Sequence, residues 1–409
     1  MMKNKNLTLL LSGQLVSQTG DKFYMLALSM MVLETTGSPA KTGLVLFAGL
    51  LPVVGAGLFS GVVVDRVNKK TLLIATDLFR GFIVSFVAYQ YIQGSLGLGT
   101  ILTSQVLLGL NSAFFNPTIP SIIPGIVKKE NLSKANAGTQ FVSGISNILG
   151  PAAGGIMVAG TGYFIVFGLN ALSFFISAGF ESLLKIPSMT SGPRESLGRS
   201  LKKGYQFIYG DSRLMNILLM VFVIHFFVGC VEVAIPVIAD LLPGKGAANM
   251  GAIQAAFGAG SVVMALALSY ARINGRESFL LFSAVGMIGC VISLIGISRV
   301  LDPNVLFPML LFGLAGSSII LAGTSFQTLI QNRTEPHMIG RVFGVVSSLG
   351  NFSIPFAMLV YGFLFEAFDL RRVMGFSGLL IILTATASFL SYGKREKLAE
   401  AKTRSGSPV

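Results

Sequence analysis

The stretch Gly61-Val-Val-Val-Asp65-Arg66-Val-Asn68-Lys69-Lys70 joins two long apolar runs, residues 41–64 and 71–92. A helix needs about twenty mostly apolar residues to cross the hydrocarbon core of a bilayer. Both runs reach that length, and the polar residues between them are too few to form a soluble segment. We therefore predict two membrane-spanning helices joined by a short loop.

The same alternation of apolar run and short polar break extends over the whole chain. The 409 residues are 53% hydrophobic and 11% charged, whereas a soluble domain carries about 25% charged residues. We predict an all-α membrane protein with twelve transmembrane helices. The predicted spans are residues 7–33, 41–64, 71–92, 97–117, 133–158, 161–186, 214–240, 248–271, 278–298, 304–329, 340–366 and 372–392.

The positions of the basic residues indicate the orientation. The chain has a formal net charge of +13, and cytoplasmic loops of membrane proteins carry an excess of Lys and Arg. Lys22 and Arg80 lie inside spans, and most other basic residues fall in breaks on the side of the N-terminus. The breaks on the opposite side contain Lys41, Lys245, Arg299, Arg371 and Arg372. This bias predicts a multi-pass protein of the cell membrane with both termini in the cytoplasm. It also explains the net positive charge without a nucleic-acid partner.

The chain also divides into two similar halves. Asp65-Arg-Val-Asn-Lys-Lys70 aligns with Ala271-Arg-Ile-Asn-Gly-Arg276, and Pro151 aligns with Pro355. Such a repeat is typical of transporter halves related by an axis along the membrane normal. We predict an N-terminal six-helix bundle at residues 1–187, a cytoplasmic linker at 188–213, a C-terminal six-helix bundle at 214–392 and a cytoplasmic tail at 393–409. The linker is expected to be an interfacial helix or a solvated stretch.

The stretch that begins at Gly61 resembles the signature loop of the major facilitator superfamily. That loop has a glycine, then Asp-Arg four residues later, then two basic residues. Asn68 stands where the family usually has a further glycine, and asparagine also tolerates a left-handed backbone conformation. Together with the repeat of six spans, the resemblance extends over the whole chain and implies the major facilitator fold.

A second motif resembles a branch of this superfamily. Gly150-Pro151-Ala-Ala-Gly154-Gly155 is similar to the core of the antiporter motif of drug:proton exporters, although Ala137 and Ser146 replace two earlier glycines. The alternative is a seam of small residues where helices pack closely. Three further features resemble the macrolide-efflux and siderophore-export branch. They are Ser17-Gln-Thr-Gly-Asp21, Asp77 with Arg80, and Leu132-Ser-Lys-Ala-Asn136.

The resemblance also implies a cytoplasmic gate. Gly61 would allow a close approach of the second span, and the Asp65 carboxylate would face the start of the eleventh span around Gly340-Arg341. A carboxylate is favoured at a helix N-terminus by the helix dipole. Supporting charges would come from Arg66, Asp77 and Arg80. The alternative is a simple turn with basic residues that set the topology, which leaves Asp65 unexplained.

Polar residues inside three spans are candidates for the wall of a water-filled cavity. Charged side chains within a membrane are costly and mark functional sites. Asp21 shares a helix face with Gln14, Ser17, Gln18 and Tyr24; Glu232 shares one with His225; and Asn136, Gln140, Ser143 and Asn147 follow the fifth span at helical spacing. The superfamily fold implies that Asp21 and Glu232 lie near one another, with Lys22 offsetting one of them. The alternative for the Asn and Gln residues is hydrogen bonding between helices.

These features predict a secondary transporter rather than an enzyme. The sequence contains no phosphate-binding loop of the P-loop type, so we expect no cofactor, no metal and no hydrolysis of ATP by this chain. The resemblance implies export of amphiphilic small molecules such as macrolides, by alternating access with a proton as partner, from a monomer in the lipid bilayer. Phe114, Phe115, Phe226 and Phe227 are expected to line the cavity. Alternatives are a lysophospholipid or siderophore exporter, a metal-cation exporter that uses Asp21 and His225, and a membrane scaffold that transports nothing.

Overall fold

The computed structural model describes residues 4–186, 206, 209, 212–270, 275–297, 305–334 and 339–404. This part of the chain folds into long α-helices and one short 3-10 helix, η1, at Lys129–Asn131. The α-helices are α1 Lys5–Thr36, α2 Pro39–Arg66, α3 Lys69–Ile92, α4 Leu98–Ile126, α5 Leu132–Thr161, α6 Tyr163–Ser182, α8 Ser212–Leu241, α9 Gly246–Tyr270, α10 Glu277–Ile297, α11 Leu306–Arg333, α12 Ile339–Ala367 and α13 Leu370–Arg404.

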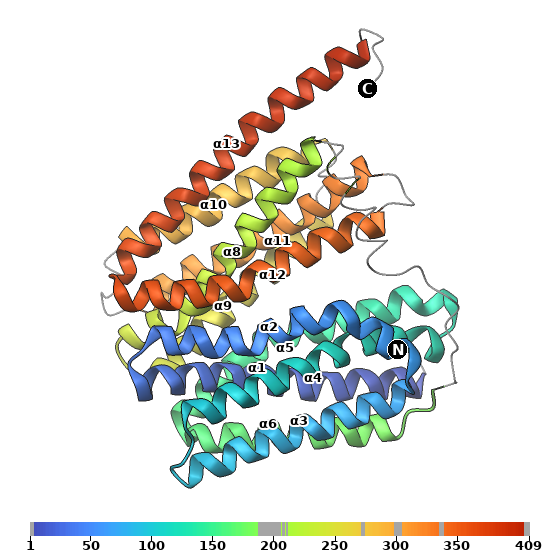
Figure 1. Cartoon of the computed structure of the whole chain (residues 1–409), viewed down its shortest axis with the longest axis vertical. Helices are drawn as coiled ribbons and strands as arrows, with labels where there is room; N and C mark the ends of the chain where they lie inside the picture. Colours follow the sequence, from blue (N-terminus) through green and yellow to red (C-terminus); the bar gives the residue numbers. More distant parts are fainter. Residues whose placement is uncertain are drawn as a thin grey trace.

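The helices form two bundles, α1–α6 and α8–α13, which Figure 1 shows as a lower and an upper group of helices. Ten helices of the described part are long and apolar enough to cross a membrane. The other two, α1 and α12, have 32 and 29 residues, which also suffices for a span, and α1 carries the polar face described above. The predicted all-α membrane fold of two six-helix bundles is confirmed.

The predicted ends of two spans differ from the structure. The fourth span was expected to end at 117, but α4 continues through Pro117, Pro120 and Pro124 to Ile126. Proline removes one backbone donor, and membrane helices tolerate this where neighbouring groups satisfy the freed carbonyls. The last helix also continues into the expected tail, to Arg404. The expected interfacial helix in 188–213 lies almost wholly outside the described residues, so the limits of the linker stay predictions.

Side-chain caps explain why the connections are short. The side chains of Asn4, Ser38 and Asn68 accept hydrogen bonds from Leu7 N, Lys41 N and Thr71 N at the starts of α1, α2 and α3. Each cap satisfies one of the free N–H groups that begin a helix. Asn68 has φ −66° and ψ 112°, so its contribution to the loop is the cap, and the left-handed conformation considered from sequence is not adopted.

The two bundles meet at one end of the molecule, which we name the Ser38 end. There Glu366 of α12 accepts hydrogen bonds from the Ser38 hydroxyl and from Ala40 N, the latter at 3.1 Å. The rings of Phe47 and Phe356 lie 5.7 Å apart. A Cβ atom on Gly155 of α5 would lie 2.9 Å from the Cα atom of Gly251 on α9. The bundles are therefore in close contact at this end through α2 with α12 and α5 with α9.

The bundles separate toward the other end, which we name the Asn4 end. On α9, Gly251 and Gly258 contact α5, but Leu266, on the same helix face, is 58% exposed. On α5, Phe141 continues the face of Gly155 and is 67% exposed. Figure 1 shows the two bundles drawing apart in this direction, and the start of α1 and the end of α13 lie at this end. One pair of helices is thus packed at the Ser38 end and open at the Asn4 end.

The close approach of α5 and α9 gives a first prediction. Gly155→Leu should force the bundles apart at the Ser38 end, because the new side chain would overlap the backbone of Gly251. We expect a longer distance between spin labels at Thr161 and Lys245, measured by pulsed electron paramagnetic resonance with the two native cysteines replaced.

Gly160→Leu is the matched control, because this residue is on the same helix and a Cβ atom there meets open space. Equal distances in the wild type and in Gly155→Leu would contradict the packing described here.

Candidate functional site

The polar face of α1 does not line a single cavity wall. Gln14 and Ser17 are buried inside the N-terminal bundle. The Tyr24 hydroxyl accepts a hydrogen bond from Gln105 Nε2 of α4 at 3.4 Å, whereas Gln18 Oε1 accepts one from the Ser143 hydroxyl of α5 at 3.0 Å. These residues therefore join α1 to its neighbours, which was the alternative left open from sequence.

Asp21 on this face is bonded into the N-terminal bundle by Arg80 of α3. Arg80 Nη1 lies 3.3 Å from Asp21 Oδ2, and Arg80 Nη2 lies 3.3 Å from Asp77 Oδ1. The Asp21 side chain is 38% exposed, whereas Arg80 and Asp77 are buried. A single guanidinium thus connects a carboxylate that solvent can reach with one that it cannot.

Two aromatic rings enclose the same guanidinium. Its carbon lies 3.8 Å from the centre of the Phe115 ring and 5.0 Å from that of Phe174. A cation is attracted to the face of an aromatic ring, more strongly where water is absent. Phe115, which the sequence suggested as a cavity wall, is instead part of this charged site.

A third carboxyl group, which the sequence analysis missed, belongs to the site. Glu181 near the end of α6 is 1% exposed, and the charged groups that act on it are Asp77 and Arg80. It is the last member of a buried polar stripe on α6 formed by Asn170, Ser173, Ser177 and Glu181. The spacing of this stripe, with residues three or four apart, was a signal that could have identified it.

The site carries more negative than positive groups. Asp21, Asp77 and Glu181 face one guanidinium, and each ion that is removed from water costs several kcal/mol before its partners compensate. Neither oxygen of Glu181 has a hydrogen-bond partner in the described part of the chain. The described residues thus hold an unbalanced buried charge, of the kind that marks a functional site within membrane helices.

Glu232 lies in a different place from the one expected. It is exposed on α8, and the charged group that acts on it is the ammonium of Lys22, which is also exposed on α1. Asp21 is adjacent to Lys22 in sequence but is turned toward Arg80. The charge of Lys22 thus acts on Glu232 across the two bundles, while Asp21 belongs to the charged site of the N-terminal bundle.

The other expected cavity residues are divided between the opening and the helix contacts. Asn136, Gln140 and Asn147 are exposed on α5, on the face between the residues that contact α1 and those that contact α9. His225 is partly buried: its Nδ1 lies 2.8 Å from Val221 O within α8, and its ring lies against Gly350 of α12. The α5 residues thus face the opening, whereas His225 packs between α8 and α12.

The antiporter-like motif makes contacts with both bundles. Gly150 and Gly154 lie against α1 at Thr19 and Phe23, while Gly155 and the carbonyl of Pro151 lie against Gly251 of α9. All four residues are buried. The motif is therefore a site of close helix packing, and it contributes to the contact that closes the Ser38 end.

The loop motif is described in part. Arg66 is exposed, and a Cβ atom on Gly61 would meet open space. The side chain of Asp65, and Gly340-Arg341 beyond their backbone, lie outside the described residues. Asp77 and Arg80, which were expected to support this loop, belong to the buried site of α1, α3 and α6.

The charged site gives a second prediction. Arg80→Leu should lower the free energy of unfolding by about 3–5 kcal/mol, because loss of one partner leaves buried carboxylates without compensation. Arg80→Leu combined with Asp77→Asn should recover part of this loss. Thermal unfolding of the purified protein in detergent measures both, with the exposed Arg372→Leu as control. Equal stability of Arg80→Leu and the wild type would contradict the site.

Comparison with solved structures agrees with the fold. A nucleoside transporter, NupG, superposes with a TM-score of 0.75 at 13% identity, covering 96% of this chain and 100% of that one. The POT family transporter PepTSo superposes with a TM-score of 0.74 at 12% identity, covering 97% and 99%. At this identity the likeness concerns the fold alone.

Sequence relatives match over nearly their whole length. Macrolide efflux protein A of Streptococcus pyogenes is 23% identical over 384 residues, covering 91% of this chain and 93% of the relative. The multidrug efflux pump Tap of Mycobacterium tuberculosis (strain ATCC 25618 / H37Rv) is 24% identical over 416 residues, covering 97% and 96%. The family model described as transmembrane secretion effector matches residues 2–405. The chain therefore belongs to the transmembrane secretion effector family of major-facilitator membrane transporters.

Proposed function

We propose that this membrane transporter exports amphiphilic small molecules of the macrolide kind in exchange for protons. Relatives of similar length include proteins named for macrolide efflux and multidrug efflux. The observation that carries the proposal is that Lys22 and Glu232, of opposite charge, are both exposed on α1 and α8, where helices of opposite bundles meet. Charges within membrane helices face a polar cavity or a partner, so the opening between the bundles is the place for the substrate.

The opening combines polar and apolar surfaces, which suits an amphiphilic substrate. Asn136, Gln140 and Asn147 present amide groups from α5, and Phe141 presents an exposed ring from the same helix. Amides orient a guest by hydrogen bonds, while apolar surface supplies binding free energy without demanding one shape. Phe226 and Phe227 pack with Tyr361 at ring distances of 5.8 and 6.3 Å, so they stabilise α8 against α12 instead.

Asp21 is the residue that we propose for proton coupling. Its carboxyl group is reached from solvent, yet it is bonded to Arg80 within the bundle. Protonation of Asp21 would weaken that ion pair and change the contact between α1 and α3. A proton and a substrate could thus favour different states of the same helices, which is the requirement for antiport.

Both termini and the open Asn4 end are proposed to face the cytoplasm, as the distribution of basic residues predicts. The conformation described here would then accept substrate from the cytoplasm, and the Ser38 end would have to open for its release. One chain contains both bundles, so we propose that a monomer carries out the cycle.

A third prediction tests the proposed function. In proteoliposomes with an imposed pH gradient, the wild type should concentrate erythromycin. Asp21→Asn should abolish this uphill transport but permit downhill exchange, because the variant cannot take up the coupling proton. Glu232→Gln should weaken erythromycin binding, since it removes a charge from the opening.

Glu34→Gln is the control, because Glu34 is an exposed carboxylate near the far end of α1. If Asp21→Asn still concentrates erythromycin in response to the pH gradient, proton coupling at Asp21 is wrong, and wild-type erythromycin binding by Glu232→Gln would contradict the role of Glu232 in the opening.

A fourth prediction concerns the loop motif. Asp65→Asn should reduce transport strongly while erythromycin binding and expression stay near wild-type levels, because Asp65 is proposed to hold the Asn4 end closed in the alternate state. Spin-label distances between α5 and α9 at Phe141 and Leu266 should then show a larger open population. Wild-type transport by Asp65→Asn would argue against the gate.

A further inference from the structure

Glu181 is the buried group that the proposed function leaves unused. Its side chain is 1% exposed, and its two oxygens have no hydrogen-bond partner in the described part of the chain. A fully ionised carboxylate without donors is costly in an interior that excludes water. A proton on this carboxyl group removes that cost.

We propose that Asp77 and Glu181 share one exchangeable proton, and that this pair leads protons from Asp21 to the Asn4 end through the interior of the N-terminal bundle. The inference rests on the proposed proton antiport, and it adds a route for the proton that is separate from the opening used by the substrate.

The ionisable groups around Glu181 define the site. On α3 these groups are Asp77 and Arg80. On α1 the group is Asp21, which contacts the same Arg80 guanidinium as Asp77. Lys134 of α5 is exposed near the start of its helix. The site thus holds one guanidinium among three carboxyl groups, and the exposed Lys22 ammonium acts on Asp21 from outside it. A metal cation is disfavoured beside this fixed positive charge, whereas a proton can lie between two acids.

The carboxyl groups are arranged along the bundle axis. Asp21 lies near the middle of α1, Asp77 lies about two turns from the α3 end that faces the Asn4 end, and Glu181 lies in the last turn of α6 at the same end. Each group is therefore closer to the Asn4 end than the one before it. A proton that moves through them in this order advances toward one face of the membrane.

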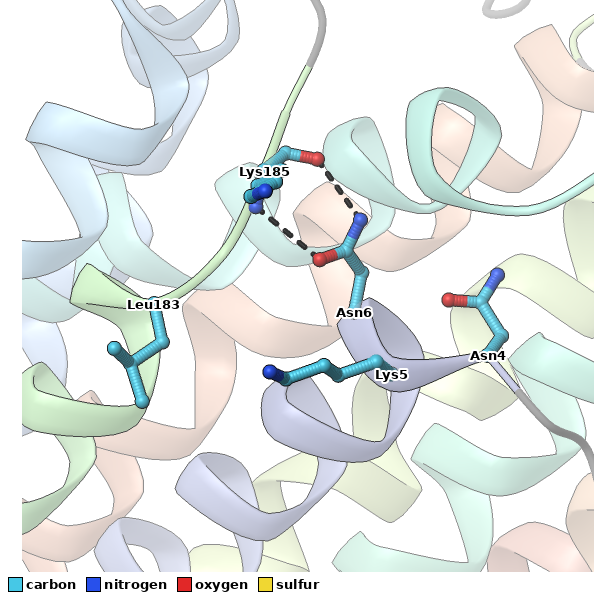
Figure 2. Close-up of a pocket in the computed structure, with 5 residues that line it drawn as sticks. All are labelled: Asn4, Lys5, Asn6, Leu183 and Lys185. Atoms are coloured by element: carbon cyan, nitrogen blue, oxygen red, sulfur yellow. Dashed lines mark hydrogen bonds between the residues drawn. The ribbon is translucent and has the colours of Figure 1, made fainter.

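A solvent-accessible pocket lies beyond Glu181 at the Asn4 end. It has a volume of about 390 Å³ and is lined by Asn4, Lys5, Asn6, Leu183 and Lys185. Figure 2 shows that it is formed by the start of α1 and the chain that follows α6. Asn6 fixes its wall: Asn6 Nδ2 donates to Lys185 O at 2.9 Å, and Lys185 N donates to Asn6 Oδ1 at 3.2 Å.

A cluster of buried leucines includes the residues next to this pocket in sequence. Leu184 lies in the turn between Glu181 and Lys185 and is buried in a cluster with Leu7 and Leu10. In the proposed route this apolar cluster limits the passage of water, so that protons do not leak when the pair is at rest. Small movements of the α6 end relative to α1 would be sufficient to connect the two sides.

Arg80 provides the coupling between the steps. When a proton from water binds an Asp21 oxygen, the guanidinium loses that counter-charge and its positive charge acts on Asp77 and Glu181. The pair then favours its ionised form, and the shared proton leaves to a water molecule of the pocket. One proton is taken up and one is released, and the charge of the site is unchanged.

The fifth prediction tests the shared proton without any substrate. Infrared difference spectra of the reconstituted full-length protein, recorded across a pH step, should show the C=O band of a buried carboxylic acid. Glu181→Gln or Asp77→Asn should remove this band, and Glu34→Gln should leave it. Persistence of the band in both variants, or its loss in the Glu34→Gln control, would overturn the shared proton.

The route is tested by transport in the same liposomes. Glu181→Gln should reduce pH-driven accumulation of erythromycin strongly while downhill exchange continues, because the opening is untouched. If the band is lost but pH-driven accumulation equals that of the wild type, the route through Glu181 is overturned, although antiport through Asp21 would stand. If Asp21→Asn also retains accumulation, the proposed coupling itself fails.

Discussion

Arg80 of α3 makes two ionic contacts at 3.3 Å: one reaches Asp21 and joins α3 to α1, and the other holds Asp77 on α3 itself. A buried guanidinium needs counter-charges on its own donors and favourable surroundings for its faces. Asp21 and Asp77 supply the charges, and Phe115 and Phe174 cover the faces. This one side chain of α3 therefore fixes the rotation of three other helices, α1, α4 and α6.

The contacts between the bundles depend on a different device. Lipid tails are as apolar as leucine, so membrane helices gain little from hydrophobic burial and associate through close packing instead. Glycine on both partners allows this at Gly155 with Gly251 and at Gly43 with Gly362. These contacts are confined to the Ser38 end, and larger side chains such as Phe141 and Leu266 follow on the same faces. The bundles can therefore meet at one end while they stay apart at the other.

The helices could be predicted from sequence because bilayer thickness imposes a length that hydropathy reveals. The residues that contact one another across helices were harder to predict, because one sequence does not give the rotation of one helix relative to another. Asp21 and Glu232 were expected to face each other, but the neighbouring residue Lys22 is the one whose charge acts on Glu232, and Asp21 is turned toward Arg80. Glu181 was missed because it lies in the last turn of its span, where a carboxylate usually reaches water. Its burial depends on α1 and α3 covering it.

The pair α2 and α12 shows why the two ends of the molecule are not independent. At the Ser38 end the Glu366 carboxylate of α12 accepts hydrogen bonds from the Ser38 hydroxyl and Ala40 N, at the start of α2. A carboxylate at a helix N-terminus is stabilised by the free N–H groups and by the helix dipole. Any opening of the Ser38 end must break both hydrogen bonds and separate the Phe47 and Phe356 rings. Both helices are continuous from one end to the other, so a change in their crossing at the Ser38 end also moves Asp65 and the start of α12.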